Sequence, residues 1–304
     1  MSKIILFYKY VNIENPNEIM VWQRELCESL ELKGRIIIAT EGINATLGGT
    51  HDNIEKYMQA MNVHPLFMGI DFKDSIGGSE YFPRLRIVVK NEIVNLGIKP
   101  EDLTVENTGK HLTPKQTHEL LQNKPKDLII LDGRNNYEAA VGKFEDAITP
   151  DIRYFRQFPE YIDQNLEQFK DKSVLMYCTG GIRCERASAY LKSKNIAKEV
   201  YQVEGGIHRY VEEYPDGYFK GKNYVFDARI TMPVNNEILG QCFVCKAKCD
   251  DYVNCLNAEC NKHFISCSDC VLKLNETCSE KCQDLVAQNK VYIRPKFKRL
   301  EATK

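Results

Sequence analysis

One sequence feature constrains the fold of this chain more than any other. It is a glycine-containing turn between a short apolar strand and a helix. Residues 173–191 read Ser-Val-Leu-Met-Tyr-Cys-Thr-Gly-Gly-Ile-Arg-Cys-Glu-Arg-Ala-Ser-Ala-Tyr-Leu, an apolar run followed by two glycines and then by good helix formers. The turn begins at Cys178. Glycines let backbone N–H groups point inward, and a helix N-terminus adds unpaired donors and partial positive charge. The sequence therefore predicts an anion-stabilising turn around the Cys178 thiol.

Cys178 is the candidate catalytic residue, because a thiol in such a turn has a lowered pKa and reacts as the thiolate. The expected active-site loop after it comprises Thr179, Gly180, Gly181, Ile182, Arg183 and Cys184. The Arg183 guanidinium is expected to reinforce the anionic form. Cys184 is interpreted either as a resolving thiol or as a helix cap. The alternative for Cys178 is an ordinary buried thiol in a glycine turn.

The spacing of Cys178 and Arg183, with four residues between them, resembles the active-site loop of the rhodanese family. In that family the sulfur can carry a persulfide. Phosphatases of the same architecture use a loop one residue longer, which accommodates a phosphate. The resemblance therefore implies sulfur chemistry, or chemistry on a small group, rather than phosphate ester hydrolysis.

Length and charge limit the classes of protein to which the chain can belong. It has 304 residues, enough for two or three domains, and a formal net charge of −1. No whole-chain electrostatic attraction to nucleic acid or membranes is therefore expected. No apolar run approaches about 20 residues, and the N-terminal apolar stretch is too short for a signal peptide. We expect a cytoplasmic protein with no membrane partner.

Residues 1–95 are predicted to form a ferredoxin-like, split βαβ domain. Asn15-Pro16 is typical of a helix start, with apolar residues at helical spacing from Ile19 onward, and a second helix is expected after Thr50. The expected strands are residues 3–11, 35–40, 45–47 and 85–90. Strand, helix, strand, strand, helix, strand is the order of that fold.

Residues 96–126 are predicted to be a linker with a short helix, and residues 127–222 a rhodanese-like α/β domain. Strands and helices alternate in the second segment, which indicates a parallel sheet covered on both faces. Cys178 then lies at the carboxyl end of a strand, where open α/β sheets place their sites. Asp132 and Arg134 follow the preceding strand. They are expected at the rim of the same pocket, either in a chemical role or as a salt bridge.

Residues 223–304 are predicted to be a cysteine-rich, zinc-binding region with a basic tail. Nine of the 12 cysteines lie between Cys242 and Cys282. Eight of them form closely spaced pairs: Cys242 and Cys245, Cys255 and Cys260, Cys267 and Cys270, Cys278 and Cys282. Four thiolates satisfy one tetrahedral Zn²⁺, so one or two structural zinc ions are predicted. The sequence leaves the pairing open, with Cys249 and His263 as substitute ligands or bystanders, and with reduced cysteines or disulfides as alternatives.

The C-terminal tail interleaves cations with aromatic side chains. Its cations are Lys290, Arg294, Lys296, Lys298 and Arg299, and its aromatic residues are Tyr292 and Phe297. This composition suits contact with a nucleic-acid strand, although short basic tails are usually solvated.

Four motifs together resemble one family, the rhodanese-domain tRNA uridine hydroxylases. They are Gly34-Arg-Ile-Ile-Ile-Ala-Thr-Glu-Gly-Ile-Asn44, Asp132-Gly-Arg-Asn-Asn-Tyr-Glu138, Phe155-Arg-Gln-Phe-Pro159 and Met176-Tyr-Cys-Thr-Gly-Gly-Ile-Arg-Cys-Glu185. The likeness spans about residues 1–230. Ala45, Gly133 and Phe219 depart from the residues usual in the family, but none of them lies in the cysteine loop.

The resemblance implies an oxidoreductase that hydroxylates C5 of the wobble uridine, position 34 of tRNA, to 5-hydroxyuridine. It implies that Cys178 is the catalytic cysteine, that molecular oxygen is the co-substrate and that the tRNA anticodon arm is the partner. No nucleotide cofactor is expected. A thiolate can add to C6 of uracil and raise the electron density at C5, where oxygen is captured.

The target base of a folded loop must be splayed out before an enzyme can reach it. Contacts to it are expected from Glu41, Asn44, Arg183 and Arg186. For the turn that contains Glu41 and Asn44, turn chemistry alone is the alternative explanation.

Two other functions stay open from the sequence. The cysteine loop alone equally supports a thiosulfate or persulfide sulfurtransferase. A second alternative is a non-catalytic, zinc-dependent module that binds RNA or protein. An intact loop around Cys178 argues against that module, because a scaffold has no need of a polarised thiol.

Overall fold

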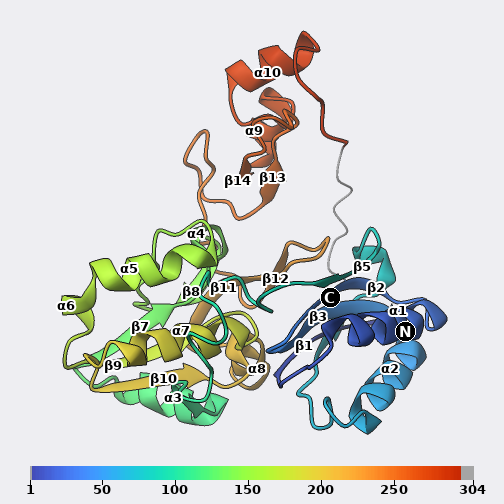
Figure 1. The fold of residues 1–304 in the computed structure, drawn as a ribbon. Helices are drawn as coiled ribbons and strands as arrows, with labels where there is room; N and C mark the ends of the chain where they lie inside the picture. Colours follow the sequence, from blue (N-terminus) through green and yellow to red (C-terminus); the bar gives the residue numbers. More distant parts are fainter. Residues whose placement is uncertain (1, 296–304) are drawn as a thin grey trace.

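The computed structural model describes residues 2–295 and arranges them in three parts (Figure 1). An N-terminal α/β domain (blue) lies beside a central α/β domain (green to yellow), and the cysteine-rich region (orange to red) extends away from them (Figure 1). The tail residues Lys296, Phe297, Lys298 and Arg299 lie outside the described residues. Within residues 2–295, none of the helices has the length and apolar character needed to cross a membrane.

The N-terminal domain is built on a five-stranded sheet. Its strands are β1 (Ser2–Tyr10), β2 (Lys33–Ala39), β3 (Gly42–Thr50), β4 (Lys73–Ile76) and β5 (Leu85–Val89). Their order is β4-β1-β3-β2-β5, antiparallel except for the parallel pair β2 and β5. The two helices are α1 (Pro16–Ser29) and α2 (His51–Val63). The predicted ferredoxin-like domain is confirmed.

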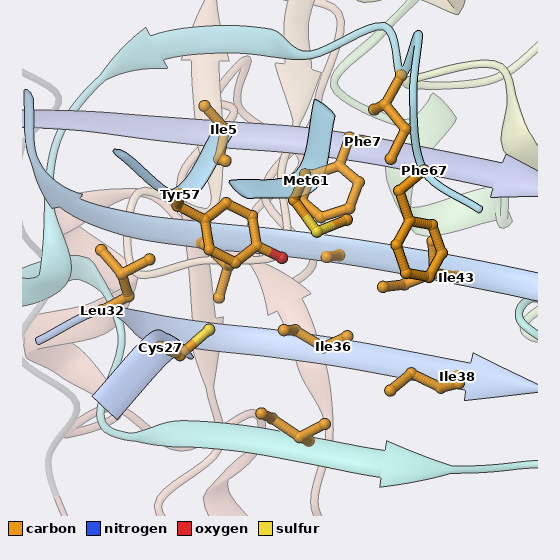
Figure 2. Close-up of a cluster of buried hydrophobic side chains, with 14 of the residues drawn as sticks. Ile5, Phe7, Cys27, Leu32, Ile36, Ile38, Ile43, Tyr57, Met61 and Phe67 are labelled. Carbon is orange, nitrogen blue, oxygen red and sulfur yellow. The ribbon is translucent and has the colours of Figure 1, made fainter. Parts of the chain in front are cut away.

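One face of this sheet carries the core of the domain. Ile5 and Phe7 of β1 and Ile36 of β2 are buried together with Tyr57 and Met61 of α2 (Figure 2). Ile5 and Phe7 are two positions apart in β1, as expected for residues on one face of a strand. The opposite face of the sheet contacts the central domain, where the hydroxyl groups of Tyr8 and Tyr10 in β1 donate to residues of α7 (Ile182–Ser193).

The strand that flanks β1 differs from the prediction. Residues 85–90 were expected to complete the split βαβ unit, but β5 pairs with β2 at the opposite edge. The strand beside β1 is β4, which the sequence analysis missed. Its sequence, Lys-Asp-Ser-Ile, is short and mostly polar, so it carries no strand-like apolar pattern.

The central domain is built on four parallel strands in the order β6-β10-β9-β7. They are β6 (Lys110–Leu112), β7 (Leu128–Asp132), β9 (Ser173–Tyr177) and β10 (Glu199–Val203). Side chains of β9 alternate between two clusters, Val174 and Met176 in one, Leu175 and Tyr177 in the other. The first cluster includes residues of α5 (Phe158–Gln164), α6 (Leu166–Phe169) and α7 (Ile182–Ser193), and the second residues of α3 (Pro114–Asn123) and α8 (Gly206–Glu213). A parallel sheet covered on both faces is confirmed.

Two of the predicted domain boundaries need correction. The segment 96–126 is more than a linker, because β6 pairs with β10 and α3 packs on α8. Residue 222 lies inside β11 (Phe219–Tyr224), which pairs with β8 (Gly142–Phe144) and β12 (Thr231–Pro233). These short strands form through pairing with distant partners, and their own sequences carry too few residues to show a period.

The cysteine-rich region contains little regular structure. Its elements are β13 (Tyr252–Asn254), β14 (His263–Ile265), α9 (Ser268–Lys273) and α10 (Glu280–Ala287), with β13 and β14 antiparallel. The region is joined to the central domain at the short helix α4 (Asn136–Ala139), where Tyr252 Oη donates to the carbonyl oxygen of Tyr137. Lys222 and Asp250 form an ion pair of 2.8 Å at the same junction. Two short 3-10 helices lie outside this region, Ser79–Tyr81 in the N-terminal domain and Phe155–Gln157 in the central domain.

Candidate active site

Cys178 lies directly after β9 and opens the turn that leads into α7. Gly181 has a φ of +98°, in the region that favours glycine, and its N–H donates to Cys178 Sγ at 3.2 Å. The turn before α8 closes on the loop from the other side. A Cβ on Gly206 would lie 2.4 Å from the carbonyl oxygen of Cys178, which accepts the N–H of Ile207 at 2.9 Å. Two glycine turns therefore fix the position of the thiol.

The surroundings of Cys178 favour its thiolate. Burial opposes ionisation, but a hydrogen bond from the Cys184 thiol, the charge of Arg183 and the N–H groups of both residues outweigh it. Together they lower the pKa of Cys178 to about 6. Roughly 90 % of a thiol with such a pKa is ionised at pH 7. Burial and the bond donated to Cys178 raise the pKa of Cys184, so Cys184 keeps its proton and donates it to the neighbouring sulfur.

Arg183 is held by Glu138, a residue for which no individual role was predicted. Arg183 Nη1 and Nη2 donate to the two Glu138 carboxylate oxygens, each at 2.7 Å. Burial would lower the pKa of Arg183, but this carboxylate raises it overall. Glu138 is fully buried and also accepts the N–H of Asn135 at 3.1 Å. The Asn135-to-Glu138 spacing of a capping box is the sequence signal that points to this residue.

A cavity of about 320 Å³, the active-site cavity, lies over the loop between the domains. The predicted residues that line it are Cys178, Thr179, Gly180, Ile182, Arg183 and Asn44. Tyr8 and Arg35 of the N-terminal domain and Phe226 after β11 also line it, and the sequence analysis missed these three. Cys178 lies in the cavity wall, with 0 % of its surface exposed. A substrate atom therefore reaches the sulfur only when a neighbouring side chain shifts.

Asp132 and Arg134 do not lie at the pocket rim, which corrects the prediction. Both are completely buried and pair with each other, Arg134 Nη2 to Asp132 Oδ2 at 2.7 Å. Arg134 also donates to the carbonyl oxygen of Gly142 at 2.6 Å, and Asp132 accepts the Tyr177 hydroxyl at 2.7 Å. These bonds draw both side chains beneath the strand ends, so the pair joins β7, β8 and β9. The salt-bridge alternative describes them correctly.

Glu41 and Arg186 also lie outside the walls of the active-site cavity. Arg186, which is fully buried, donates to Glu41 at 2.6 Å and to the carbonyl oxygen of Ile98 at 2.6 Å. Glu41 in turn accepts the N–H of Ile93 at 2.8 Å. The expected substrate contacts of Glu41 and Arg186 are therefore replaced by an ion pair that fastens the N-terminal domain to α7. Asn44 does line the cavity, with its Nδ2 donating to Ile93 O at 3.0 Å.

Family models match three successive parts of the chain. Their descriptions are UPF0176 acylphosphatase like domain for residues 2–93, rhodanese-like domain for residues 113–213 and rhodanase C-terminal for residues 220–283. A protein of Corynebacterium urealyticum named tRNA uridine(34) hydroxylase is 41 % identical over 287 residues, which are 92 % of this chain and 96 % of that protein. One of Bacillus mycoides with the same name is 41 % identical over 286 residues, 92 % of this chain and 89 % of that protein.

The chain belongs to the tRNA uridine(34) hydroxylase family. Solved structures resemble it over a smaller part. A rhodanese-like domain protein of Staphylococcus aureus is 27 % identical and covers 33 % of this chain and 90 % of its own, with a TM-score of 0.28.

In this member of the tRNA uridine(34) hydroxylase family, the eight paired cysteines gather into two clusters. One contains Cys242, Cys245, Cys267 and Cys270, and the other Cys255, Cys260, Cys278 and Cys282. Cys249 and His263 belong to neither cluster. The first pair along the chain joins the third, and the second joins the fourth. The two clusters are therefore interleaved, which the sequence left open.

The sulfur spacing in both clusters fits a tetrahedral zinc ion. Cys245 and Cys267 Sγ are 3.6 Å apart, as are those of Cys260 and Cys278. Ligands about 2.3 Å from a tetrahedral Zn²⁺ lie about 3.8 Å from one another. A disulfide needs about 2.05 Å. The residues present therefore fit two zinc ions, which would hold this small region together.

A partly buried hydrogen-bond network joins α7, the helix that follows the cysteine loop, to the N-terminal domain of this hydroxylase-family chain. The Glu185 carboxylate accepts the Tyr8 hydroxyl at 2.9 Å and Gln202 Nε2 at 3.1 Å, and it contacts His111 Nε2 at 2.9 Å. The hydrogen bond to Glu185 raises the pKa of His111 against the opposing effect of burial. Glu185 and Arg186 directly follow the cysteine loop in α7. The contacts of Glu185 with Tyr8 and of Arg186 with Glu41 therefore attach the N-terminal domain to this helix.

Proposed function

We propose that this chain is an oxidoreductase that hydroxylates C5 of uridine 34 in tRNA, with Cys178 as nucleophile and molecular oxygen as co-substrate. The observation that carries the proposal is a cysteine whose pKa is lowered to about 6 and which lies in the wall of a cavity between two domains. Family membership supplies the reaction and its substrate, because the relatives are named for this activity. We also propose that the chain acts in the cytoplasm, on the tRNA found there.

The reaction begins with addition of the Cys178 thiolate to C6 of the uracil ring. This forms a carbon–sulfur bond and moves electron density to C5, which then bonds to one atom of O₂. Loss of the C5 proton and of the thiolate restores the ring and the free Cys178. The second oxygen atom leaves as water, so two electrons and two protons must come from an external donor such as a thiol. Overall, a C5–H becomes C5–OH.

Ionisation of Cys178 is the part of this chemistry that the loop supplies. Arg183 and the N–H groups of the loop stabilise the thiolate before attack, and they accept it again when the carbon–sulfur bond breaks. Both terminal nitrogens of the Arg183 guanidinium already donate to the Glu138 carboxylate. The role of Arg183 in the proposal is therefore electrostatic, toward the sulfur.

The active-site cavity is proposed to hold the target base after it leaves the anticodon stack. Its volume of about 320 Å³ is at the lower end of the range for small-ligand sites. Asn44 lies in its wall, and its Nδ2 is engaged by Ile93 O, which leaves Oδ1 to accept N3–H of a uracil. Asn44 is therefore the proposed base-reading residue. A base that is unpaired in a loop costs little to extrude.

The test is in vitro hydroxylation of tRNA with mass spectrometry of its nucleosides. Wild type is expected to form 5-hydroxyuridine in an oxygen-dependent manner, and Cys178→Ser to form none. Thiosulfate sulfurtransferase activity, measured on the same preparations, separates the alternative enzyme. Full hydroxylation by Cys178→Ser would overturn the proposal, and sulfur transfer without hydroxylation would establish the sulfurtransferase. Absence of both activities would support the binding module.

A further inference from the structure

A second and larger cavity opens beside the active-site cavity. This cleft of about 1140 Å³, here called the zinc-side cleft, lies between the central domain and the cysteine-rich region. The central-domain wall includes Tyr137, Arg153 and Tyr154, and the cysteine-rich wall includes Phe243, Lys246 and Lys262. In Figure 1 the cysteine-rich region extends away from the central domain near α4, which matches this position.

Each wall of the zinc-side cleft carries an exposed aromatic ring next to cations. Phe243 is 43 % exposed, with Lys262 Nζ 3.8 Å and Lys246 Nζ 5.4 Å from its ring centre. On the opposite wall, Tyr154 is 50 % exposed and the Arg153 guanidinium lies 5.8 Å from its ring centre. Aromatic residues and arginine are enriched at binding surfaces relative to the rest of a protein surface.

The charge of the zinc-side cleft is positive. Its cations are Arg35, Arg153, Lys246 and Lys262, and within residues 2–295 none of them forms an ion pair with a carboxylate. Asp227, the one acidic residue among the described lining, is paired with Arg229. The cations are therefore available to an anionic partner.

The zinc-side cleft adjoins the active-site cavity. Arg35, Val225, Phe226 and Asp227 line both. Phe226 is 61 % exposed at this junction, and its ring centre lies 6.0 Å from the Arg183 guanidinium. A polymer whose one base occupies the active-site cavity would thus pass Phe226 and enter the zinc-side cleft.

We propose that the zinc-side cleft binds the single-stranded RNA nucleotides next to the target base, with Phe243 and Tyr154 stacking on bases and Lys246, Lys262 and Arg153 contacting phosphates. This inference rests on the proposed function, because it needs an RNA substrate at Cys178. Alternation of aromatic rings and cations suits single strands, since every base offers a face for stacking and every nucleotide a charge. A rigid duplex would not present its bases to the two rings. The cysteine-rich region is thereby assigned as one wall of the RNA site.

The experiment measures binding of a synthetic anticodon stem-loop RNA to the zinc-loaded full chain by fluorescence anisotropy over a range of salt concentrations. Phe243→Ala is expected to weaken binding about tenfold, the effect of losing one stacked base. Lys246→Ala combined with Lys262→Ala is expected to lower the slope of log K against log salt by about 1.4, about 0.7 for each lost phosphate contact on a single strand. The matched control is Lys248→Ala with Lys273→Ala, two exposed lysines of the same region outside the cleft.

Unchanged affinity and salt slope in the cleft variants would overturn the inference, as would an equal effect of the control pair. Equal loss of binding to a loop-free duplex RNA would also overturn it, since that indicates general attraction to RNA. Metal content measured on every variant ensures that the cysteine clusters are intact. Hydroxylation by the wild-type chain, assayed on the same RNA, reports on the proposed function separately. Binding through the cleft without hydroxylation would refute the function, whereas hydroxylation without cleft binding would refute this inference.

Discussion

Glu138 and Arg183 are 45 residues apart in the chain, yet two hydrogen bonds of 2.7 Å join them close to the Cys178 sulfur. Glu138 is completely buried, and Arg183 is nearly so. Removing one partner of a buried ion pair leaves the other charge uncompensated. The pair therefore links the stability of the central domain to the position of the guanidinium that faces Cys178.

Glu138→Gln is expected to lower the free energy of unfolding by about 3–5 kcal/mol, the usual cost of breaking a buried pair. It should also lower the hydroxylation rate, since Arg183 is no longer fixed. Urea denaturation measures the first effect. Glu145→Gln is the control, because it removes an exposed partner of Lys220 and should cost no more than about 1 kcal/mol. Equal losses in the two variants would contradict the structural role of Glu138.

The contact between His111 and Glu185 makes stability depend on pH. The folded-state pKa of His111 is raised, so its contribution is fully present below the unfolded pKa of about 6.5 and is lost as pH rises through the folded value. Burial opposes ionisation of Glu185, but hydrogen bonds from its neighbours lower its pKa overall. The contribution of Glu185 to folding stability is therefore lost as pH falls through its folded-state pKa. His111→Gln should therefore flatten the decline in unfolding temperature above about pH 6.5.

Thermal unfolding followed between about pH 6 and 9 tests this dependence. His51→Gln is the control, because that histidine lies at the start of α2, is 51 % exposed and contacts Asp52 and Glu55 instead of Glu185. The effect should be small, since the His111 side chain is 41 % exposed and solvent screens the pair. A pH profile that His111→Gln leaves unchanged would show that the contact contributes nothing.

Interleaving of the two cysteine clusters predicts two zinc ions per chain, bound in a mutually dependent way. Cys260→Ser should lower the metal content below two, and a strong chelator should expose residues 240–290 to protease, because zinc supplies the folding energy of such regions. Metal analysis by mass spectrometry measures the content. Cys249→Ser, which alters a cysteine outside both clusters, should keep two ions. Loss of metal in that variant would refute the assigned ligands.

The active-site loop was predictable because its signal is local. Cys178, two glycines, Arg183 and the start of α7 follow one another within a few residues, and a strand-to-helix turn imposes their geometry. The parallel sheet was predictable for the same reason, since strand and helix patterns alternate along the chain. The cysteine spacings likewise indicated metal binding before any contact was known.

Long-range contacts were not predictable from the sequence. The Glu138 carboxylate meets Arg183 only once β7 and β9 are paired, and Arg186 meets Glu41 only when two domains dock. Arg134 was expected at a rim, but the adjacent Gly142 carbonyl and Asp132 draw its long side chain inward. Strand β4 lacks an apolar period and exists because β1 offers an unpaired edge. Which cysteine pairs share a cluster is likewise decided by the three-dimensional fold, so the spacing along the chain did not predict it.

The central claim is that Cys178 is a thiolate at neutral pH, and titration of that thiol tests it most directly. Thiolate absorbance near 240 nm, recorded against pH for wild type and for Cys178→Ser with the metal sites loaded, gives the titration of this one sulfur as a difference. A midpoint at about pH 6 is the predicted result. A midpoint near 8.5, the value of an unperturbed cysteine, would contradict the account.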